Sequence, residues 1–357
     1  MKIYFDVAYL YYLPHFEPVI DALLASAADS SVKVGVTFIS EPPPSITESL
    51  HSKNVTTHLL AEDERLSFYQ SQAPDWVIFG HAADIANDLN DCCKTALILH
   101  GLGPKSTYYN ASSAAIQYRF VESEHRKQRL EAMYPNKTFI NTGYTKLDPI
   151  INDPTIAMDL TALGLNPAKP TLLYSPTFYP STIENFPKDW PQQFSDYNIL
   201  IKPHYLSLIK SAYKKQRLLL ERWATFSNVY LADMSEQSLV PFMATADIMI
   251  SETSSALFEF IALDKPVIIG HFLKLRWGYR GILKFRLNKR LSDDYELFGS
   301  MGTNINRYSE LKEAVELNIQ QPQTHHSARQ SITQQVVGNV DGQCSQRVAN
   351  FLLNPTG

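Results

Sequence analysis

Short apolar runs without polar alternation constrain the fold of this chain more than any other feature. Examples are Ala96–Leu99, Ile248–Ile250 and Val267–Ile269. A strand with one face in water alternates apolar and polar side chains, so unbroken runs are typical of strands buried on both faces of a parallel sheet. Longer stretches with helical spacing separate these runs. The order of strand and helix therefore predicts an α/β protein with doubly wound sheets.

The predicted strands form two sets of similar size. In the first half they are Lys2–Val7, Lys33–Ile39, Trp76–Phe79, Thr95–Leu99, Tyr118–Val121 and Thr138–Ile140. In the second half they are Thr171–Tyr174, Asn198–Ile201, Val229–Leu231, Asp247–Ile250 and Pro266–Ile269. The helices expected between them are Phe16–Ser26, Leu206–Ala224, Ser255–Leu263 and Ser309–Leu317.

The boundary between the two halves is expected at residues 153–170, where proline and glycine interrupt a short helix. This predicts an N-terminal Rossmann-like domain of residues 1–155 and a second one of residues 168–325, facing each other across a cleft. The last segment, residues 326–357, contains a helical stretch too long to be a tail. By analogy with other two-domain folds, we expect it to return to the first domain.

Composition limits the class of protein. A hydrophobic content of 45% with 19% charged residues is typical of a soluble globular chain, and the net charge of −4 excludes a globally basic nucleic-acid binder. Adjacent Cys92 and Cys93 with a distant Cys344 fit buried thiols in a reducing cytoplasm, and the lack of CxxC spacing argues against structural zinc. No uncharged apolar run reaches the roughly 18 residues of a membrane span. We therefore expect a cytoplasmic protein, at most peripheral to the membrane.

Parallel sheets bind ligands beyond the carboxyl ends of their strands, so the loops directly after strands are the candidate sites. His100 ends one predicted strand, and Gly101 and Gly103 let the backbone turn sharply and approach a ligand closely. Lys105 follows within reach of an anion. These residues predict a contact to an acceptor or a phosphate. A purely structural histidine at a strand end remains the alternative.

A second loop follows the predicted strand Asn198–Ile201. Pro203 restricts Lys202 to an extended conformation and fixes the direction in which His204 leaves the strand. A cation beside a histidine suits a phosphate or carboxylate ligand. A surface Lys-Pro turn is the alternative.

A third loop lies in the segment ADIMISETSSALFEF, residues 246–260. Ser251, Thr253, Ser254 and Ser255 offer hydroxyls, and the helix that starts there offers unpaired N–H groups, an arrangement that binds anions. The same residues also serve as ordinary helix caps. Glu252 would repel an anion, so we expect it to point away or to bind a sugar or ribose hydroxyl.

Two further segments are candidates. Thr177 lies in a proline-punctuated loop after the predicted strand Thr171–Tyr174 and is expected to line the donor site. The stretch Phe272–Arg290 carries seven basic and no acidic residues, interleaved with aromatic ones. It fits either an anionic membrane surface or polymer, or a solvated helix.

Several of these motifs, in this order, resemble the CDP-glycerol glycerophosphotransferase family. They are HGLGPK, NTGYTKLD, YSPTF, IKPH, ADIMISETSSALFEFIALDKPVI and VVGNVDGQCSQRV, between His100 and Val348. Members of that family build teichoic-acid-like polymers or decorate surface glycans. The resemblance implies a GT-B fold, a CDP-glycerol donor and a surface-glycan or lipid-linked acceptor. We expect no tightly bound cofactor and no metal-ligand residues, and whether a divalent metal is required stays open.

The resemblance also implies roles for individual residues. His100 matches the histidine proposed as general base, and His204 matches the histidine near the donor phosphates. Ser254 and Ser255 match the paired serines that bind the donor pyrophosphate or glycerol phosphate. This chain departs from the family at Glu252 and Thr253, where an Asp and an aromatic residue are usual, and at Lys202, where Arg is frequent. Ser251 and Thr177 complete the expected set of donor contacts.

The expected reaction is phosphoryl transfer. An acceptor hydroxyl, deprotonated by His100, would attack the glycerol-bearing phosphorus of CDP-glycerol and expel CMP, while Lys202, His204 and the helix start near Ser254 stabilise charge. Two alternatives remain open. One is a GT-B glycosyltransferase or nucleotide-sugar epimerase, and the other is a non-catalytic subunit that binds a glycan or a partner.

Overall fold

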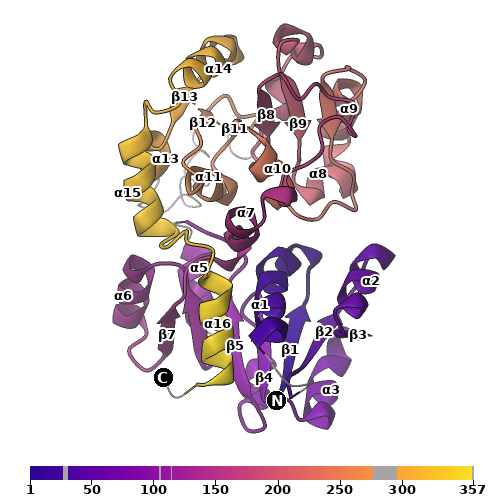
Figure 1. Cartoon of the computed structure of the whole chain (residues 1–357), viewed down its shortest axis with the longest axis vertical. Coiled ribbons are helices and arrows are strands. Elements are labelled where there is room, and N and C mark those ends of the chain that lie inside the picture. Colours follow the sequence, from indigo (N-terminus) through magenta and orange to yellow (C-terminus); the bar gives the residue numbers. More distant parts are fainter. Residues whose placement is uncertain (27–30, 104–105, 114, 276–295, 356–357) are drawn as a thin grey trace. The chain divides into compact units, whose positions relative to one another are not determined.

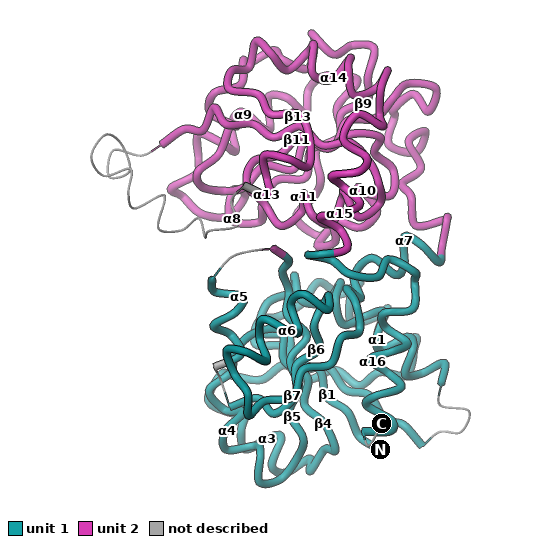
Figure 2. The backbone as a smooth tube through the Cα atoms, turned by 90° about the vertical axis from the view of Figure 1, so that its left-hand side faces the viewer, with its two compact units in different colours: residues 1–102, 106–152, 335–357 teal, residues 103–105, 153–334 magenta. Residues whose placement is uncertain are grey.

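The computed structural model describes residues 1–26, 31–103, 106–113, 115–275 and 296–355. Its contacts divide the chain into two compact units (Figure 2). Unit 1 comprises residues 1–102, 106–152 and 335–357, and unit 2 comprises residues 153–334 together with Gly103. Each unit contains its own parallel sheet.

Unit 1 is built on a sheet with the strand order β3-β2-β1-β4-β5-β6-β7, in which every neighbouring pair is parallel. The strands are β1 Lys2–Val7, β2 Lys33–Phe38, β3 Thr56–Leu59, β4 Trp76–Phe79, β5 Lys94–Ile98, β6 Tyr118–Val121 and β7 Thr138–Asn141. The chain runs outward from β1 to β3 and then returns to β4 on the other side of β1. The topological switch point, where such sheets bind ligands, therefore lies between β1 and β4.

Helices pack on this sheet and close its core. They are α1 Leu13–Ser26, α2 Pro44–Ser52, α3 Arg65–Gln72, α4 Ala86–Leu89, α5 Ser106–Asn110, α6 Glu124–Met133, α7 Asp148–Asn152 and α16 Cys344–Leu353. The C-terminal helix α16 lies beside α1 (Figure 1), and its buried face, including Val348 and Leu352, joins the same core as the strands. Trp76 Nε1 donates a hydrogen bond to the carbonyl oxygen of Leu352 at 3.1 Å. The end of the chain is thus part of the first unit's core.

Unit 2 contains a parallel sheet with the order β10-β9-β8-β11-β12-β13. Its strands are β8 Thr171–Tyr174, β9 Asn198–Ile201, β10 Val229–Leu231, β11 Ile248–Ser251, β12 Val267–Gly270 and β13 Thr303–Ile305. Its helices are α8 Tyr205–Ile209, α9 Lys214–Trp223, α10 Val240–Thr245, α11 Ser255–Ile261, α13 Glu296–Ser300, α14 Leu311–Gln320 and α15 His326–Val336, whose last turn passes into unit 1. The switch point of this sheet lies between β8 and β11.

Several elements differ from the sequence-based expectation. Strands β3 and β13 were not predicted, because both are short. In addition, β3 lies at an edge of its sheet, and each of its four residues is at least partly exposed. The helix expected over residues 206–224 is divided into α8 and α9 with a 3-10 turn between them. The last stretch is also two helices, since Gly338 and Gly342 adopt left-handed φ angles of 78° and 70°. The break between the units falls after Asn152, and residues 326–334 remain with unit 2.

Within the described ranges, every helix is too short or too polar to cross a lipid bilayer.

Candidate functional site

His100 lies two residues after the end of β5, at the carboxyl edge of the unit 1 sheet. Its Nδ1 lies 2.7 Å from the carbonyl oxygen of Gly80, which follows β4. A carbonyl oxygen only accepts hydrogen bonds, so Nδ1 must carry a proton and donate it. In the neutral ring the lone pair is then on Nε2. The neighbouring strand therefore holds His100 in the tautomer of a base that acts through Nε2.

Aromatic rings surround His100. The ring of Tyr12 stacks on it with centroids 4.7 Å apart, and the ring of Tyr11 meets it edge-on at 5.2 Å. Both tyrosines come from the loop after β1. Further inside unit 1, His15 is completely buried, and this burial, reinforced by Lys146 and His100, holds its pKa well below 6.5. His15 is therefore a neutral core histidine.

Glycine is required at positions 101 and 103 for two different physical reasons. A Cβ on Gly101 would lie 2.3 Å from the Tyr108 hydroxyl oxygen, so the missing side chain makes room for that tyrosine. Gly103 has φ +98°, a conformation that strains any other residue. Lys105, expected to contact an anion, lies outside the described residues.

Glu252 follows β11 at the switch point of unit 2 and is 1% exposed. One carboxylate oxygen accepts hydrogen bonds from Thr182 N at 2.6 Å, Thr182 Oγ1 at 2.5 Å and Ser181 Oγ at 3.2 Å. The other accepts from Thr177 N at 2.7 Å. Burial raises the pKa of the Glu252 carboxyl, while these hydrogen bonds lower it. Glu252 thus joins the loop after β11 to the loop after β8.

Three of the residues named as candidate donor contacts use their side chains for hydrogen bonds within unit 2. The side chain of Glu252 points into unit 2, which is the first of the two orientations expected for it. The hydroxyl of Ser251, also 1% exposed, donates to the Ser175 carbonyl oxygen at 2.5 Å. The hydroxyl of Thr177 donates to the Pro180 carbonyl oxygen at 2.6 Å. Their side chains are occupied within the unit, so we assign them a structural role.

The remaining hydroxyls of this loop lie at the start of α11. Ser254 is the N-cap residue of α11, and its Oγ accepts a hydrogen bond from Ala256 N at 3.3 Å. Thr253, Ser254 and Ser255 are all half-buried. The helix cap expected as the alternative to an anion site is therefore present, and the side chains around it are partly accessible.

His204 follows β9 and is held in the opposite tautomer from His100. Its Nδ1 accepts a hydrogen bond from the backbone N–H of Leu206 at 3.1 Å, so the proton of the neutral ring is at Nε2, and the residue as a whole is exposed. Phe178, from the loop after β8, packs against the ring with centroids 4.6 Å apart. Lys202 Nζ lies 6.0 Å from the ring centroid of Phe242. His204 is therefore arranged to donate a hydrogen bond through Nε2.

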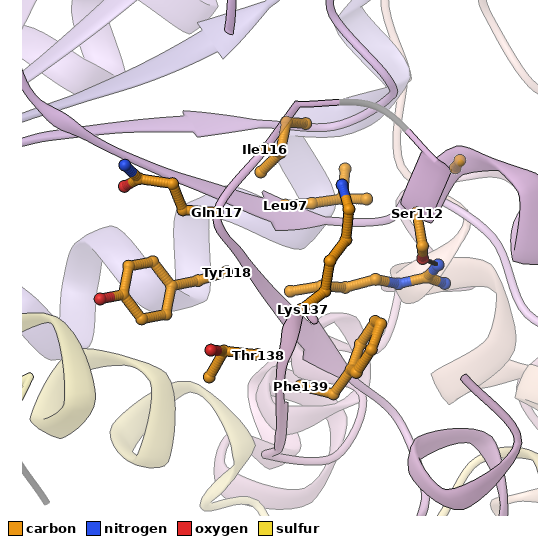
Figure 3. A pocket seen from close by; sticks show the side chains of 10 residues that line it. Leu97, Ser112, Ile116, Gln117, Tyr118, Lys137, Thr138 and Phe139 are labelled. Atoms are coloured by element: carbon orange, nitrogen blue, oxygen red, sulfur yellow. Dashed lines mark hydrogen bonds between the residues drawn. The ribbon is translucent and has the colours of Figure 1, made fainter. Parts of the chain in front are cut away.

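A small hollow of about 10 Å³, partly open to solvent, lies elsewhere in unit 1 (Figure 3). Its walls come from β5, from the start of β6 and β7, and from the loop before β6. Arg119 and Lys137 are among its lining residues. Because it is formed by the amino-terminal parts of β6 and β7, it is not part of the carboxyl edge that carries His100.

Sequence reasoning missed the tyrosines after β1 and His81 after β4. Both segments directly follow strands, so the same criterion that identified His100 would have found them. Most of the basic stretch Phe272–Arg290, one of the further candidate segments, lies outside the described residues.

Comparisons with known proteins agree with this architecture. The wall teichoic acid polymerase TagF superposes with a TM-score of 0.67 over 99% of this chain and 88% of its own, at 14% identity. A UDP-GlcNAc 2-epimerase from Neisseria meningitidis, solved with UDP-GlcNAc, gives a TM-score of 0.61 over 99% and 100% of the two chains, also at 14% identity. Such low identity shows a common fold, which is the expected α/β, GT-B-like class.

A curated relative is the teichoic acid glycerol-phosphate primase of Bacillus spizizenii. It is 28% identical over 153 residues, which are 42% of this chain. The match spans only 38% of the length of the primase. The model of the CDP-glycerol:poly(glycerophosphate) glycerophosphotransferase family matches residues 100–354, which include both candidate histidines. This chain therefore belongs to the CDP-glycerol:poly(glycerophosphate) glycerophosphotransferase family.

Proposed function

We propose that the protein transfers glycerol phosphate from CDP-glycerol to a hydroxyl of a surface glycan or teichoic-acid-like acceptor and releases CMP. The observation that carries this proposal is the pair of opposite tautomers. His100 presents a basic Nε2, and His204 presents an Nε2–H donor. Such a base and such a donor are what a transfer to a hydroxyl requires. Family membership supports the choice of donor.

His100 is the proposed general base. Its Nε2 accepts the proton of the acceptor hydroxyl while the oxygen attacks the glycerol-bearing phosphorus. A new P–O bond forms, the P–O bond to the CMP group breaks, and CMP leaves with the bonding electron pair. The hydrogen bond to Gly80 stabilises the imidazolium that results, because the carbonyl dipole faces the protonated ring.

Unit 2 is proposed to hold the donor. The His204 Nε2–H is suited to a phosphate oxygen, and Lys202 supplies a positive charge from the same loop. The half-buried hydroxyls of Thr253, Ser254 and Ser255 are the further donor contacts that we propose. The hydrogen bonds of Glu252 keep the loop that carries Phe178, and with it the His204 ring, in place.

Gly101, Gly103 and Lys105 are proposed to contact the acceptor or its phosphate. We also propose that the protein is cytoplasmic and that Phe272–Arg290 attaches it to an anionic membrane surface. Complete recovery of the protein in the soluble phase at low salt, in the presence of anionic vesicles, would contradict this attachment.

The test is CMP release from CDP-glycerol by purified protein supplied with an acceptor. General base catalysis contributes about 10²–10⁴-fold, so His100→Ala should lower kcat by that factor and leave CDP-glycerol binding intact. His125→Ala, at an exposed histidine on α6, is the matched control and should keep full activity. If His100→Ala turned over like the wild type, the role of base would be wrong.

The epimerase likeness supports a second candidate function, the use of a nucleotide sugar. A donor panel of CDP-glycerol, CDP-ribitol and UDP-sugars, with detection of CMP, CDP, UDP and epimerised sugar, distinguishes the two. We expect CMP from CDP-glycerol. Release of UDP or an epimerised sugar would favour the alternative, and no turnover with any donor would favour a binding subunit.

A further inference from the structure

The switch point of the unit 1 sheet is flanked by aromatic residues that the proposed chemistry has not yet used. The loop after β1 carries Tyr9, Tyr11 and Tyr12, and the loop after β4 carries His81. Open α/β sheets bind ligands in the crevice beyond the carboxyl ends at this point. His100 follows the next strand, β5. We call Tyr9, Tyr11 and Tyr12 the tyrosine platform.

The platform has a buried base and an exposed upper layer. Tyr12 is 1% exposed and lies under the other two, with ring centroids 5.7 Å from Tyr9 and 4.9 Å from Tyr11, both edge-to-face. Tyr9 and Tyr11 stack on each other at 5.3 Å with an interplanar angle of 11°, and they are 55% and 39% exposed. Two parallel aromatic rings are thus displayed to solvent on a fixed support.

This platform is connected directly to the candidate base. Tyr12 stacks on the ring of His100, and Tyr11 meets the same ring edge-on at 5.2 Å. A molecule that contacts the exposed part of Tyr11 therefore lies beside a ring that is itself in contact with His100. The platform is a place for the group that loses its proton to His100.

The chemistry of the platform favours a sugar ring. A pyranose has apolar C–H faces and a polar rim of hydroxyls, which match a flat tyrosine ring and its hydroxyl. A glycerol phosphate unit has no ring face and carries a charge that calls for cations. The nearby Asp6 is ion-paired to Arg65 at 2.6 Å.

We propose that the tyrosine platform binds a neutral pyranose ring at the reacting end of the acceptor and directs one of its hydroxyls to His100. The acceptor class is then a glycan end, not a glycerol phosphate chain. This assignment rests on the proposed function for its use in catalysis, whereas sugar binding by the platform stands on the geometry of unit 1 alone.

A binding experiment without any donor tests the platform itself. Saturation-transfer NMR with N,N′-diacetylchitobiose should show contact to the sugar ring protons in the wild type. The double variant Tyr9→Leu/Tyr11→Leu should weaken binding about tenfold, whereas Tyr9→Phe/Tyr11→Phe, which keeps both ring faces, should bind nearly as well as the wild type. Tyr197→Leu, at a partly exposed tyrosine before β9, is the matched control and should change nothing. No binding by the wild type, or equal binding by the Leu variant, would overturn the proposal.

CMP release distinguishes a failure of the tyrosine platform from a failure of the proposed function. With CDP-glycerol, the Leu double variant should raise KM for an alkyl pyranoside acceptor about tenfold and leave KM for CDP-glycerol unchanged. Sugar binding that depends on the rings, without CMP release, would refute the proposed function and leave the platform standing. CMP release that prefers a glycerol phosphate acceptor and ignores the Leu substitutions would refute the platform and leave the function standing.

Discussion

Glu252→Gln is the substitution that most sharply tests the structural role of the loop after β11. The wild-type carboxylate accepts from the fixed backbone N–H groups of Thr177 and Thr182 with different oxygens. Glutamine has one carbonyl oxygen and one NH₂ group, so in either orientation one backbone N–H faces another donor. The hydroxyls of Ser181 and Thr182 can rotate, but a backbone N–H cannot.

A buried donor left without an acceptor costs about 1–3 kcal/mol. We therefore expect Glu252→Gln to lower the unfolding free energy of unit 2 by about 1–3 kcal/mol, a large part of the roughly 5–15 kcal/mol typical of a domain. Urea unfolding followed by the fluorescence of the buried Trp190 and Trp223 measures this. Hydrogen exchange at the Thr177 and Thr182 amides should rise. Glu313→Gln, at an exposed glutamate on α14, is the control and should change stability by less than about 0.5 kcal/mol.

The pH dependence gives an independent readout of the same group. Burial raises the pKa of Glu252, so above its ordinary value of 4.5 the folded state binds the proton more tightly than the unfolded state. The contribution of this group to stability is therefore largest at low pH and is lost as pH rises through the raised pKa. The unfolding free energy of the wild type minus that of Glu252→Gln should therefore decrease as the pH rises above 4.5.

The structural role of Glu252 would be refuted if Glu252→Gln unfolded like Glu313→Gln and bound CDP-glycerol more weakly. Glu252 would then contact the donor.

Two further predictions concern unit 1. Burial, reinforced by Lys146 and His100, lowers the pKa of His15, so below about pH 6.5 the unfolded chain binds more protons than the folded chain and the unfolding free energy should fall on acidification. In urea titrations at about pH 5 and pH 7.5, His15→Phe should reduce this dependence of the unfolding free energy on pH. Equal pH dependence in the wild type and His15→Phe would contradict the prediction. The Asp148 carboxylate accepts hydrogen bonds from Cys344 N at 3.3 Å and Ser345 N at 2.6 Å at the start of α16. Asp148→Ala should therefore lower the unfolding free energy by about 1–2 kcal/mol and speed hydrogen exchange at those two amides, whereas Asp91→Ala, at an exposed site, should do neither. Unchanged protection of the α16 amides would show that Asp148 does not hold this helix.

Much of the architecture follows from local pattern. The runs without polar alternation correctly identify strands such as β5, β11 and β12, because a strand buried on both faces needs apolar side chains at every position. The same pattern fails for β3 and β13, which are short and lie at the ends of their sheets, where fewer buried positions are required. The division of the last segment into two helices depends on glycines whose φ angles the sequence alone does not give.

The candidate site divides in a similar way. The rule that ligands bind after strands selects His100 and His204 from the sequence, and the N-cap role of Ser254 is a local property of a strand–turn–helix segment. The buried role of Glu252 is not local. Its partners, Thr177 to Thr182, lie about 70 residues earlier and reach it only because β8 and β11 are neighbours.

The sequence by itself determined two α/β units, the positions of most strands and the loops in which chemistry is expected. Hydrophobic periodicity is a property of neighbouring residues, so it is legible without tertiary structure. The tertiary structure alone decided that Gly80 fixes the tautomer of His100, that Glu252 faces inward, and that the tyrosines after β1 lie against the candidate base. These facts depend on which strands are adjacent, and strand order is set by the packing of the whole sheet, which no short stretch of sequence contains.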